Sequence, residues 1–247
     1  MTKQNTTNKG FFGFIEKLIR LFPFIYSIAR SLIKYTNYFE EDFFILKKIF
    51  KNKKINIIDV GASDGISVLF FMRNLNVNLI YCYEPQKIFF KKLCKLKKKF
   101  KNLIIFNYGL GKKANKKEIY IPYFYFLGKK IFLLTYSFPI KNELIDQINL
   151  DFLVKPKIEK SSILVKKFKL ISRKINLIKI DTNGSEFEIV HSLLKIIKRD
   201  KPVLIIENNN IKKIYSLLRK YKYKKYCVTN DKLKIHKNEN NANIIFK

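Results

Sequence analysis

The stretch Ile55-Asn-Ile-Ile-Asp-Val-Gly-Ala-Ser-Asp-Gly65 decides the fold of this chain. Its first half is apolar and mostly β-branched, which is typical of a strand buried on both faces of a parallel sheet. Gly61 and Gly65 permit a tight turn and a close approach of the backbone to a ligand. A helix is predicted from Ile66, and the free N–H groups of its first turn would face the crevice above the strand. The pattern indicates a nucleotide-type pocket.

The acids beside this turn indicate which nucleotide it would take. A dinucleotide site usually carries G-x-G-x-x-G, whereas this turn reads G-x-x-x-G with carboxylates at Asp59 and Asp64. Those charges would repel a pyrophosphate but suit S-adenosylmethionine, which has an ammonium and a sulfonium and no phosphate. A second strand, expected at 79–83, ends at Glu84, 23 positions after Gly61. This is close to the spacing of about 20 for a ribose-binding carboxylate. We favour a binding site over a strand–turn–helix with incidental acids.

The composition predicts one globular domain with an unusual charge. The chain has 247 residues, of which 47% are hydrophobic, enough for one sizeable core. The formal net charge of +32 raises nucleic acid and anionic membranes as partners. Residue types with AT-rich codons are abundant, Gly (8) and Pro (6) are scarce, and Trp is absent. We favour codon bias as the origin of the charge, and we expect no specific nucleic-acid partner.

The cysteine and histidine content argues against metal chemistry. Cys82, Cys94 and Cys227 are scattered without C-x-x-C spacing, and the odd count indicates a reducing compartment. His191 and His236 are the two histidines of the chain, too few for a His-rich cluster. We therefore expect a cytoplasmic protein with no metal site.

The N-terminal segment Phe11–Lys34 superficially resembles a signal peptide or membrane anchor. Charged residues and Pro23 break its apolar run, and no small-residue cleavage site follows. Two short amphipathic helices fit it better. We favour their packing on the domain as a cap, and the alternative is peripheral contact with the anionic inner membrane surface. A further helix is predicted at 40–50 and leads into the first strand.

The middle of the chain continues the alternation of strands and helices. A helix at 86–101 carries a dense run of lysines around one apolar stripe, which indicates a solvated face. A strand at 103–107, a turn at Gly109 and Gly111, and an extended segment from 118 to 122 follow. Residues 123–160 are rich in aromatics, and their length and position indicate an insertion over the pocket that contacts the acceptor. The next strand is predicted at 163–170.

A second motif begins at Ile175, where another buried-type strand ends at Asp181 and a glycine turn. A helix at 186–198, a strand at 201–207 ending in Glu207, a helix at 211–222 and short strands at 226–229, 233–236 and 243–246 complete the prediction. Together with Asp59 and Glu84, these acids mark the C-terminal strand ends, where open α/β sheets bind ligands. Such a rim suits a cationic cofactor and a deprotonated hydroxyl acceptor.

Not every acid near the second turn needs a chemical role. Ser185 and Glu188 fit a capping box, and Glu186 in the first helical turn gains from the helix dipole. A structural and a catalytic role for Glu186 therefore stay equally open. Asp181 has no comparable capping role and is the general base we favour. His191 is expected to be an ordinary, partly buried histidine.

These motifs, in this order and spacing over about residues 55–210, resemble the FkbM family of S-adenosylmethionine-dependent methyltransferases. The stretches that carry the resemblance are Ile57-Ile-Asp-Val-Gly-Ala-Ser-Asp-Gly65, Tyr83-Glu-Pro85, Leu177-Ile-Lys-Ile-Asp-Thr-Asn-Gly-Ser-Glu186 and Lys201-Pro-Val-Leu-Ile-Ile-Glu207. The resemblance implies a Rossmann-like class I methyltransferase fold at 51–247 behind an N-terminal extension at 1–50. This α/β fold has a mostly parallel sheet, an antiparallel last strand and helices on both faces. The resemblance also implies O-methylation, frequently of a sugar hydroxyl in a glycan or a related metabolite.

The resulting site has a cofactor side and a catalytic side. The predicted cofactor-binding residues are Asp59, Gly61, Ala62, Ser63, Gly65, Glu84, Pro85 and Asn107, and the predicted catalytic residues are Asp181, Glu186 and Glu207. The chain departs from the family pattern at Asn183, where a Glu is usual, and at Ile171, where an Asp is usual. Two alternatives remain. One is a catalytically inactive cofactor-binding protein. The other is a nucleic-acid methyltransferase, but the amino-methylating type usually carries an Asp/Asn-Pro-Pro-aromatic motif, and Asp181-Thr-Asn-Gly184 does not match it.

Overall fold

The computed structural model describes residues 39, 41–229, 232–237 and 241–247. It divides into two compact units, the smaller containing Glu118–Ser161 and the larger containing Asn37–Lys117 and Ser162–Lys247. The amphipathic helices predicted within Phe11–Lys34, with their cap or membrane role, lie outside the described residues.

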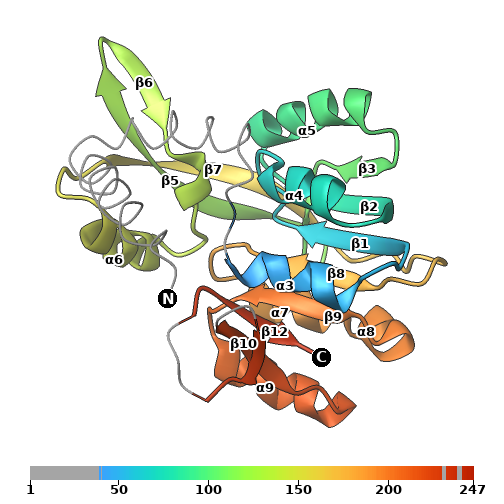
Figure 1. Cartoon of the computed structure of the whole chain (residues 1–247). Coiled ribbons are helices and arrows are strands. Elements are labelled where there is room, and N and C mark those ends of the chain that lie inside the picture. The colour runs from blue at the N-terminus through green and yellow to red at the C-terminus, as the bar shows by residue number, and fades with distance from the viewer. Residues whose placement is uncertain (1–38, 40, 230–231, 238–240) are drawn as a thin grey trace, which may run out of the picture. The chain divides into compact units, whose positions relative to one another are not determined.

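An eight-stranded sheet in the order β11-β10-β12-β9-β8-β1-β2-β3 forms the centre of the larger unit (Figure 1). Its strands are β1 (Ile55–Val60), β2 (Val77–Tyr83), β3 (Leu103–Phe106), β8 (Leu177–Ile180), β9 (Val203–Glu207), β10 (Lys225–Thr229), β11 (Lys232–Ile235) and β12 (Asn243–Phe246). The five strands from β3 to β9 pair in parallel, whereas β12 runs antiparallel to β9 and β10 antiparallel to β12 and β11. This topology confirms the Rossmann-like, mostly parallel sheet expected from the sequence.

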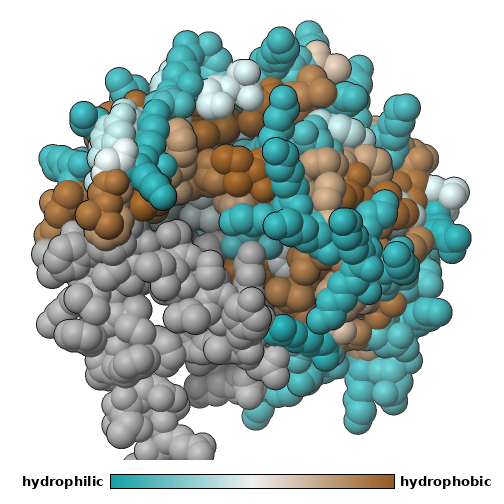
Figure 2. All heavy atoms as spheres, turned by 90° about the horizontal axis from the view of Figure 1, so that it is seen from above, coloured by the Kyte–Doolittle hydropathy of each residue, from teal (hydrophilic) through white to brown (hydrophobic). Residues whose placement is uncertain are grey.

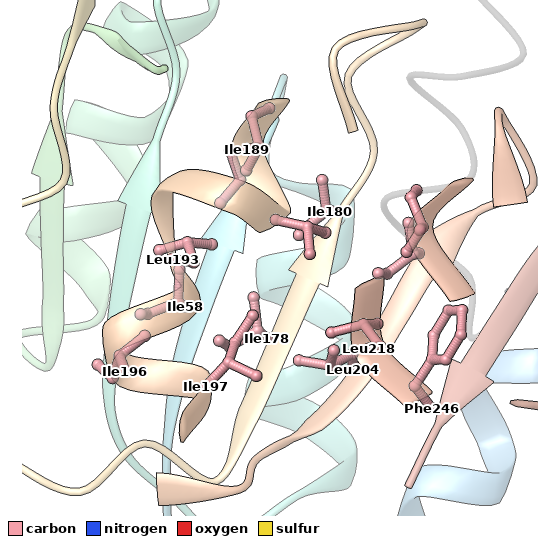
Figure 3. Packing of buried hydrophobic residues seen from close by; sticks show 14 of the residues in the cluster. Ile58, Ile178, Ile180, Ile189, Leu193, Ile196, Ile197, Leu204, Leu218 and Phe246 are labelled. Atoms are coloured by element: carbon pink, nitrogen blue, oxygen red, sulfur yellow. The ribbon is translucent and has the colours of Figure 1, made fainter. Parts of the chain in front are cut away.

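Helices cover both faces of this sheet because successive strand residues point to opposite sides. Along β1, Ile57 packs into one apolar cluster and Ile58 into the other. The first cluster includes residues of α3 (Glu41–Ile49), α4 (Ile66–Asn74) and α5 (Lys87–Lys99). The second includes residues of α7 (Glu186–Ser192), α8 (Leu194–Asp200) and α9 (Ile211–Leu218), and Figure 3 shows α7 and α8 side chains over Ile58 and Ile178. Helix α3, predicted as part of the N-terminal extension, thus packs into the core of the larger unit.

Four local predictions differ from the structure. The single helix expected at 186–198 is two helices, which meet at Leu193, where the bend lets Leu193 and Ile197 both pack against the sheet. Gly109 does not sit in a turn with Gly111, because Gly109–Leu110 forms the short strand β4, paired with β7 (Lys157–Lys166). Strand β7 begins and ends earlier than the strand predicted at 163–170. The last predicted helix ends at Leu218 and continues as the 3₁₀ helix η2 (Arg219–Tyr221).

The smaller unit has its own apolar core around a helix and a hairpin. Strand β5 (Asn115–Phe126) pairs antiparallel with β6 (Lys129–Phe132), and η1 (Leu134–Tyr136) and α6 (Lys141–Asp151) follow. Strands β5 and β6 belong to a four-stranded sheet, whose order is β4-β7-β5-β6. The buried core residues are Leu133, Leu144, Ile148 and Phe152. The unit coincides closely with the insertion predicted at 123–160, whose contact with an acceptor stays a prediction.

The lysines of helix α5 lie away from the apolar core. In the lysine-rich α5, Phe89 and Leu93 are buried and the lysines lie at partly or fully exposed positions, as the single apolar stripe predicted. On the face in Figure 2, hydrophilic side chains are interspersed with apolar ones. Among the helices that the structure describes, none is long and apolar enough to span a bilayer.

A stability comparison tests why glycine is needed at two positions of the turn after β1. Gly61 has φ 76° and Gly65 φ 84°, but a Cβ on Gly61 would lie 1.9 Å from the backbone oxygen of Asp181, whereas one on Gly65 would meet the flexible side chain of Leu96. We expect Gly65→Ala to lower the free energy of unfolding by about 1–3 kcal/mol. Gly61→Ala should cost at least about 1 kcal/mol more, because a backbone carbonyl cannot rotate aside. Equal losses in urea unfolding would contradict the close backbone contact.

Candidate active site

The turn between β1 and α4 is fixed to the end of β2. The N–H groups of Gly61 and Ala62 donate to the carbonyl of Tyr83 at 3.0 and 3.4 Å. Ser63 adopts a left-handed conformation, and Gly65 begins α4 in the same region of φ. The open side of each glycine faces protein, the Asp181 backbone for Gly61 and Leu96 for Gly65. Packing of the chain on itself therefore accounts for both glycines before any ligand is considered.

Glu84, at the end of β2, closes the turn from the other side. Its Oε2 accepts a hydrogen bond from the Ser63 N–H and its Oε1 one from the Gln86 N–H, both at 2.8 Å. Burial raises the pKa of Glu84 to about 7, although these two N–H donors oppose the shift. Each carboxylate oxygen keeps further acceptor capacity, so the pair can still receive two hydroxyl donors.

Asn107, directly after β3, holds the backbone on which Glu84 sits. Its side-chain amide donates to the carbonyls of Glu84 and Pro85 at 3.0 and 3.2 Å. Hydrogen bonds thus join the predicted cofactor-binding residues that follow β1, β2 and β3.

A lysine that the sequence analysis did not single out lies at the centre of the site. Lys179 on β8 stands directly opposite Asp59 on β1 and is buried with it. Its ammonium donates to the carbonyl of Gly61 at 2.8 Å and lies 3.3 Å from a carboxylate oxygen of Asp59 and 3.3 Å from one of Asp181. Burial alone would lower the pKa of Lys179, but the Asp181 and Asp59 carboxylates outweigh it and raise the pKa above its usual range. The sequence did contain a signal for this residue, because Lys179 is a charged residue within the apolar run Leu177–Ile180.

Asp59 and Asp181 differ in how far they can reach a ligand. The second oxygen of Asp59 accepts from the hydroxyl of Ser67 on α4 at 2.6 Å, and Asp59 is fully buried. Its predicted place beside a cofactor ammonium stays a prediction. The Asp181 side chain is 48% exposed and has Lys179 as its ion-pair partner.

Glu186 folds back onto the turn that precedes its own helix. Its carboxylate accepts from the N–H and hydroxyl of Thr182 and from the N–H of Gly184, at 3.0–3.1 Å. Burial raises its pKa despite these donors. The predicted capping box is wrong: Ser185 makes no side-chain cap, and both its hydroxyl and the Glu188 carboxylate contact the ammonium of Lys117 instead.

Glu207 lies next to Asp181 because the last ladder pair of β8 and β9 is Ile180 with Ile206. It accepts from the N–H of Asn183 at 3.4 Å. Burial, followed by the negative charges of Asp181 and Glu186, raises the pKa of Glu207 to about 8. The departure from the family pattern at Asn183 therefore falls in the turn beside this carboxylate, in a left-handed conformation that Asn tolerates well.

The assembled strand ends suit a cation that carries hydroxyl groups. Burial raises the pKa values of Glu84, Glu186 and Glu207, and a positive charge nearby would relieve that cost. The hydroxyl of Ser63 is buried without a hydrogen-bond partner. These features fit the ribose, ammonium and sulfonium of S-adenosylmethionine. Within the described ranges, no three His, Cys, Asp or Glu side chains gather to hold a metal ion.

This sheet, with its acidic strand ends, is that of a Rossmann-like methyltransferase. A family model, the methyltransferase FkbM domain, matches residues 59–225, more than half of the chain. The chain belongs to the FkbM family of S-adenosylmethionine-dependent methyltransferases. A search of curated protein sequences found no match.

Several solved structures are similar to the chain at low identity. The methyltransferase FkbM from Methylobacillus flagellatus KT is 13% identical, with a TM-score of 0.49, over 78% of this chain and 43% of that one. The present chain thus spans less than half of that protein. SMU.1697c from Streptococcus mutans, solved with SAH, is 9% identical, with a TM-score of 0.43, over 85% and 98% of the two chains. TYW2 from M. jannaschii, solved with AdoMet, is 12% identical, with a TM-score of 0.37, over 85% and 74%.

Removing the buried ammonium should destabilise the larger unit. Lys179→Met leaves Asp59 buried beside an apolar side chain, and we expect a loss of about 3–5 kcal/mol in the free energy of unfolding. The double variant Lys179→Met/Asp59→Asn should recover part of that loss, because no buried charge is then left unpaired. Lys160→Met, which removes the exposed partner of Glu118, is the matched control and should unfold like the wild type. A Lys179→Met protein as stable as the control would show that the ammonium is dispensable.

Proposed function

We propose that this protein transfers a methyl group from S-adenosylmethionine to a hydroxyl group of a sugar, in a glycan or a related metabolite. The observation that carries the proposal is the pair of carboxylates Asp181 and Glu207 at neighbouring strand ends. A hydroxyl becomes a good nucleophile when a positioned carboxylate takes its proton. The family resemblance supports the sugar as the acceptor.

On the cofactor side, Glu84 is the residue that would hold the ribose. Its two oxygens are already oriented by the N–H groups of Ser63 and Gln86, and they can accept from a pair of adjacent hydroxyls. The unpartnered hydroxyl of Ser63 would bind a further polar group. When bound, S-adenosylmethionine supplies a methyl group made electrophilic by the sulfonium.

On the acceptor side, environment separates the roles of the two carboxylates. Asp181 is half exposed and forms an ion pair with Lys179 through one oxygen, so a carboxylate oxygen at the surface of the site can accept the hydroxyl proton. Glu207, with a pKa of about 8, carries its proton at neutral pH and can donate a hydrogen bond that orients the acceptor. Two carboxyl groups in different environments can divide acid and base roles in this way. Glu186, whose carboxylate is occupied by the turn at 182–184, positions that turn.

Nucleic acid is the second acceptor class that an observation favours, because the chain carries a net charge of +32. Its electrostatic attraction would be sequence-independent and would weaken steeply with salt. Purified protein incubated with methyl-labelled S-adenosylmethionine and separate glycan, RNA and lipid fractions distinguishes the classes. We expect label in the glycan fraction, and label in RNA alone would overturn the sugar proposal.

Cofactor binding should depend on the ionised form of Glu84. Titration calorimetry with S-adenosylhomocysteine should give a micromolar Kd, and Glu84→Gln should weaken it about tenfold or more, equivalent to about 1.4 kcal/mol. Because the carboxyl group is protonated below its pKa of about 7, wild-type affinity should fall several-fold from pH 8 to pH 6. Glu84→Gln should be insensitive to pH over this range. Glu188→Gln, the same change at an exposed carboxylate, should bind like the wild type, and an unaltered Glu84→Gln would remove Glu84 from the site.

Asp181 and Glu207 should respond differently to replacement of the carboxyl group by an amide. Asp181→Asn should lower kcat by about 10²-fold or more with S-adenosylhomocysteine affinity within a few-fold of wild type. Glu207→Gln, which resembles the protonated form, should retain most activity. It should also abolish the decline in kcat/KM that we expect above about pH 8, where wild-type Glu207 loses its proton. An active Asp181→Asn together with an inactive Glu207→Gln would reassign the base to Glu207.

A further inference from the structure

The tip of the β5–β6 hairpin exposes three consecutive large apolar residues. Tyr125 is 60% exposed, Phe126 41% and Leu127 87%. Phe126 pairs with Lys129, so Leu127 and Gly128 form a two-residue loop, and both have positive φ, 48° and 72°. Figure 1 shows the two strands of this hairpin, β5 and β6, and the loop that joins them.

Leu127 is a poor choice for this loop by local criteria. Two-residue hairpin loops with positive φ at both positions favour Asn, Asp or Gly, whose backbones adopt that conformation most easily. Leucine strains the backbone there, and its side chain gains almost no burial in return. Local rules broken without a structural gain are expected at functional sites. The apolar tip is therefore best explained by a partner that buries it.

The charges behind the tip indicate the chemistry of that partner. Between Ile119 and Asn142 the sequence contains three lysines and no Asp or Glu. The ammonium of Lys157, on the neighbouring segment, lies over the ring of Tyr125 at 5.6 Å, and Lys130 lies over the ring of Tyr123 at 4.0 Å and pairs with Glu159. An aliphatic tip, then aromatic rings, then ammonium groups is the order in which a bilayer presents hydrocarbon, interface and anionic headgroups.

We propose that the tip of the β5–β6 hairpin inserts into the surface of an anionic lipid bilayer. Leu127 enters the boundary between headgroups and acyl chains, Tyr125 and Phe126 lie at the interface, and Lys129 contacts the headgroups. A single-stranded nucleic acid is less well matched, because it would require a stacking ring at the most exposed position, where the chain has leucine. The proposal does not depend on the identity of the methyl acceptor.

The absence of tryptophan from the chain makes a local test possible. Leu127→Trp introduces a single fluorescent reporter at the tip, and Ile235→Trp introduces one on β11, where Ile235 is 63% exposed. With vesicles of phosphatidylcholine and phosphatidylglycerol, the Leu127→Trp emission should shift to shorter wavelength. The Ile235→Trp emission should stay unchanged, and pure phosphatidylcholine should produce a weaker shift at position 127. No shift at position 127 with anionic vesicles overturns the proposal.

A second variant separates membrane binding from folding. Leu127→Asn places a favoured residue in the loop, so the variant should be at least as resistant to thermal unfolding as the wild type. Its vesicle partition coefficient in co-sedimentation should fall about tenfold, the effect of losing one buried leucine side chain. Ile235→Asn should partition like wild type. Equal partitioning of Leu127→Asn and wild type contradicts the proposal, as does a Leu127→Trp shift that appears with protein concentration or with RNA in the absence of vesicles.

Discussion

The buried ammonium of Lys179 is the interaction on which the site depends. It joins the first strand through Asp59, the glycine turn through the carbonyl of Gly61, and the fourth parallel strand through Asp181. Parallel strands bring their C-terminal ends to one edge, but they also bring carboxylates together there. A single cation placed among them lets the charges coexist in a buried setting, because a buried ion pair is tolerable when its remaining donors and acceptors are also satisfied.

That arrangement divides the acids of the site by task. Asp59 is held by Ser67 and Lys179, Glu84 by two backbone N–H groups, and Glu186 by its own turn. Glu84 and Glu186 fix backbone geometry, whereas Asp59 positions two side chains, and Glu84 alone among the three keeps an obvious way to bind a ligand as well. Asp181 and Glu207 remain as the pair for which we propose a role in the chemistry. A site whose functional groups are positioned by other buried polar groups can keep its geometry between turnovers.

The strong positive charge of the chain and the acidity of this site are separate features. The lysines of α5 surround a narrow apolar stripe and occupy partly or fully exposed positions, where charge adds solubility and general attraction to anions. The acids at the strand ends form a local exception. The β5–β6 hairpin is a third case, in which a few lysines stand behind an apolar tip, so the arrangement and not the total charge indicates the partner.

The sequence by itself determined the parallel sheet and the acids at its edge, because buried strands leave continuous apolar runs and the carboxylates directly follow them. The antiparallel end was implied only by the resemblance to the FkbM family. It could not show that Lys179 faces Asp59, since that depends on the register between strands far apart in the chain. It also misassigned Ser185 and Glu188, because the spacing of a capping box does not reveal that Lys117 lies within reach of both. Only the tertiary structure decided which acids hold backbone and which face outward. The same is true of the glycines: a turn motif predicts Gly61, but the reason that no side chain fits there is the Asp181 backbone brought against it by folding.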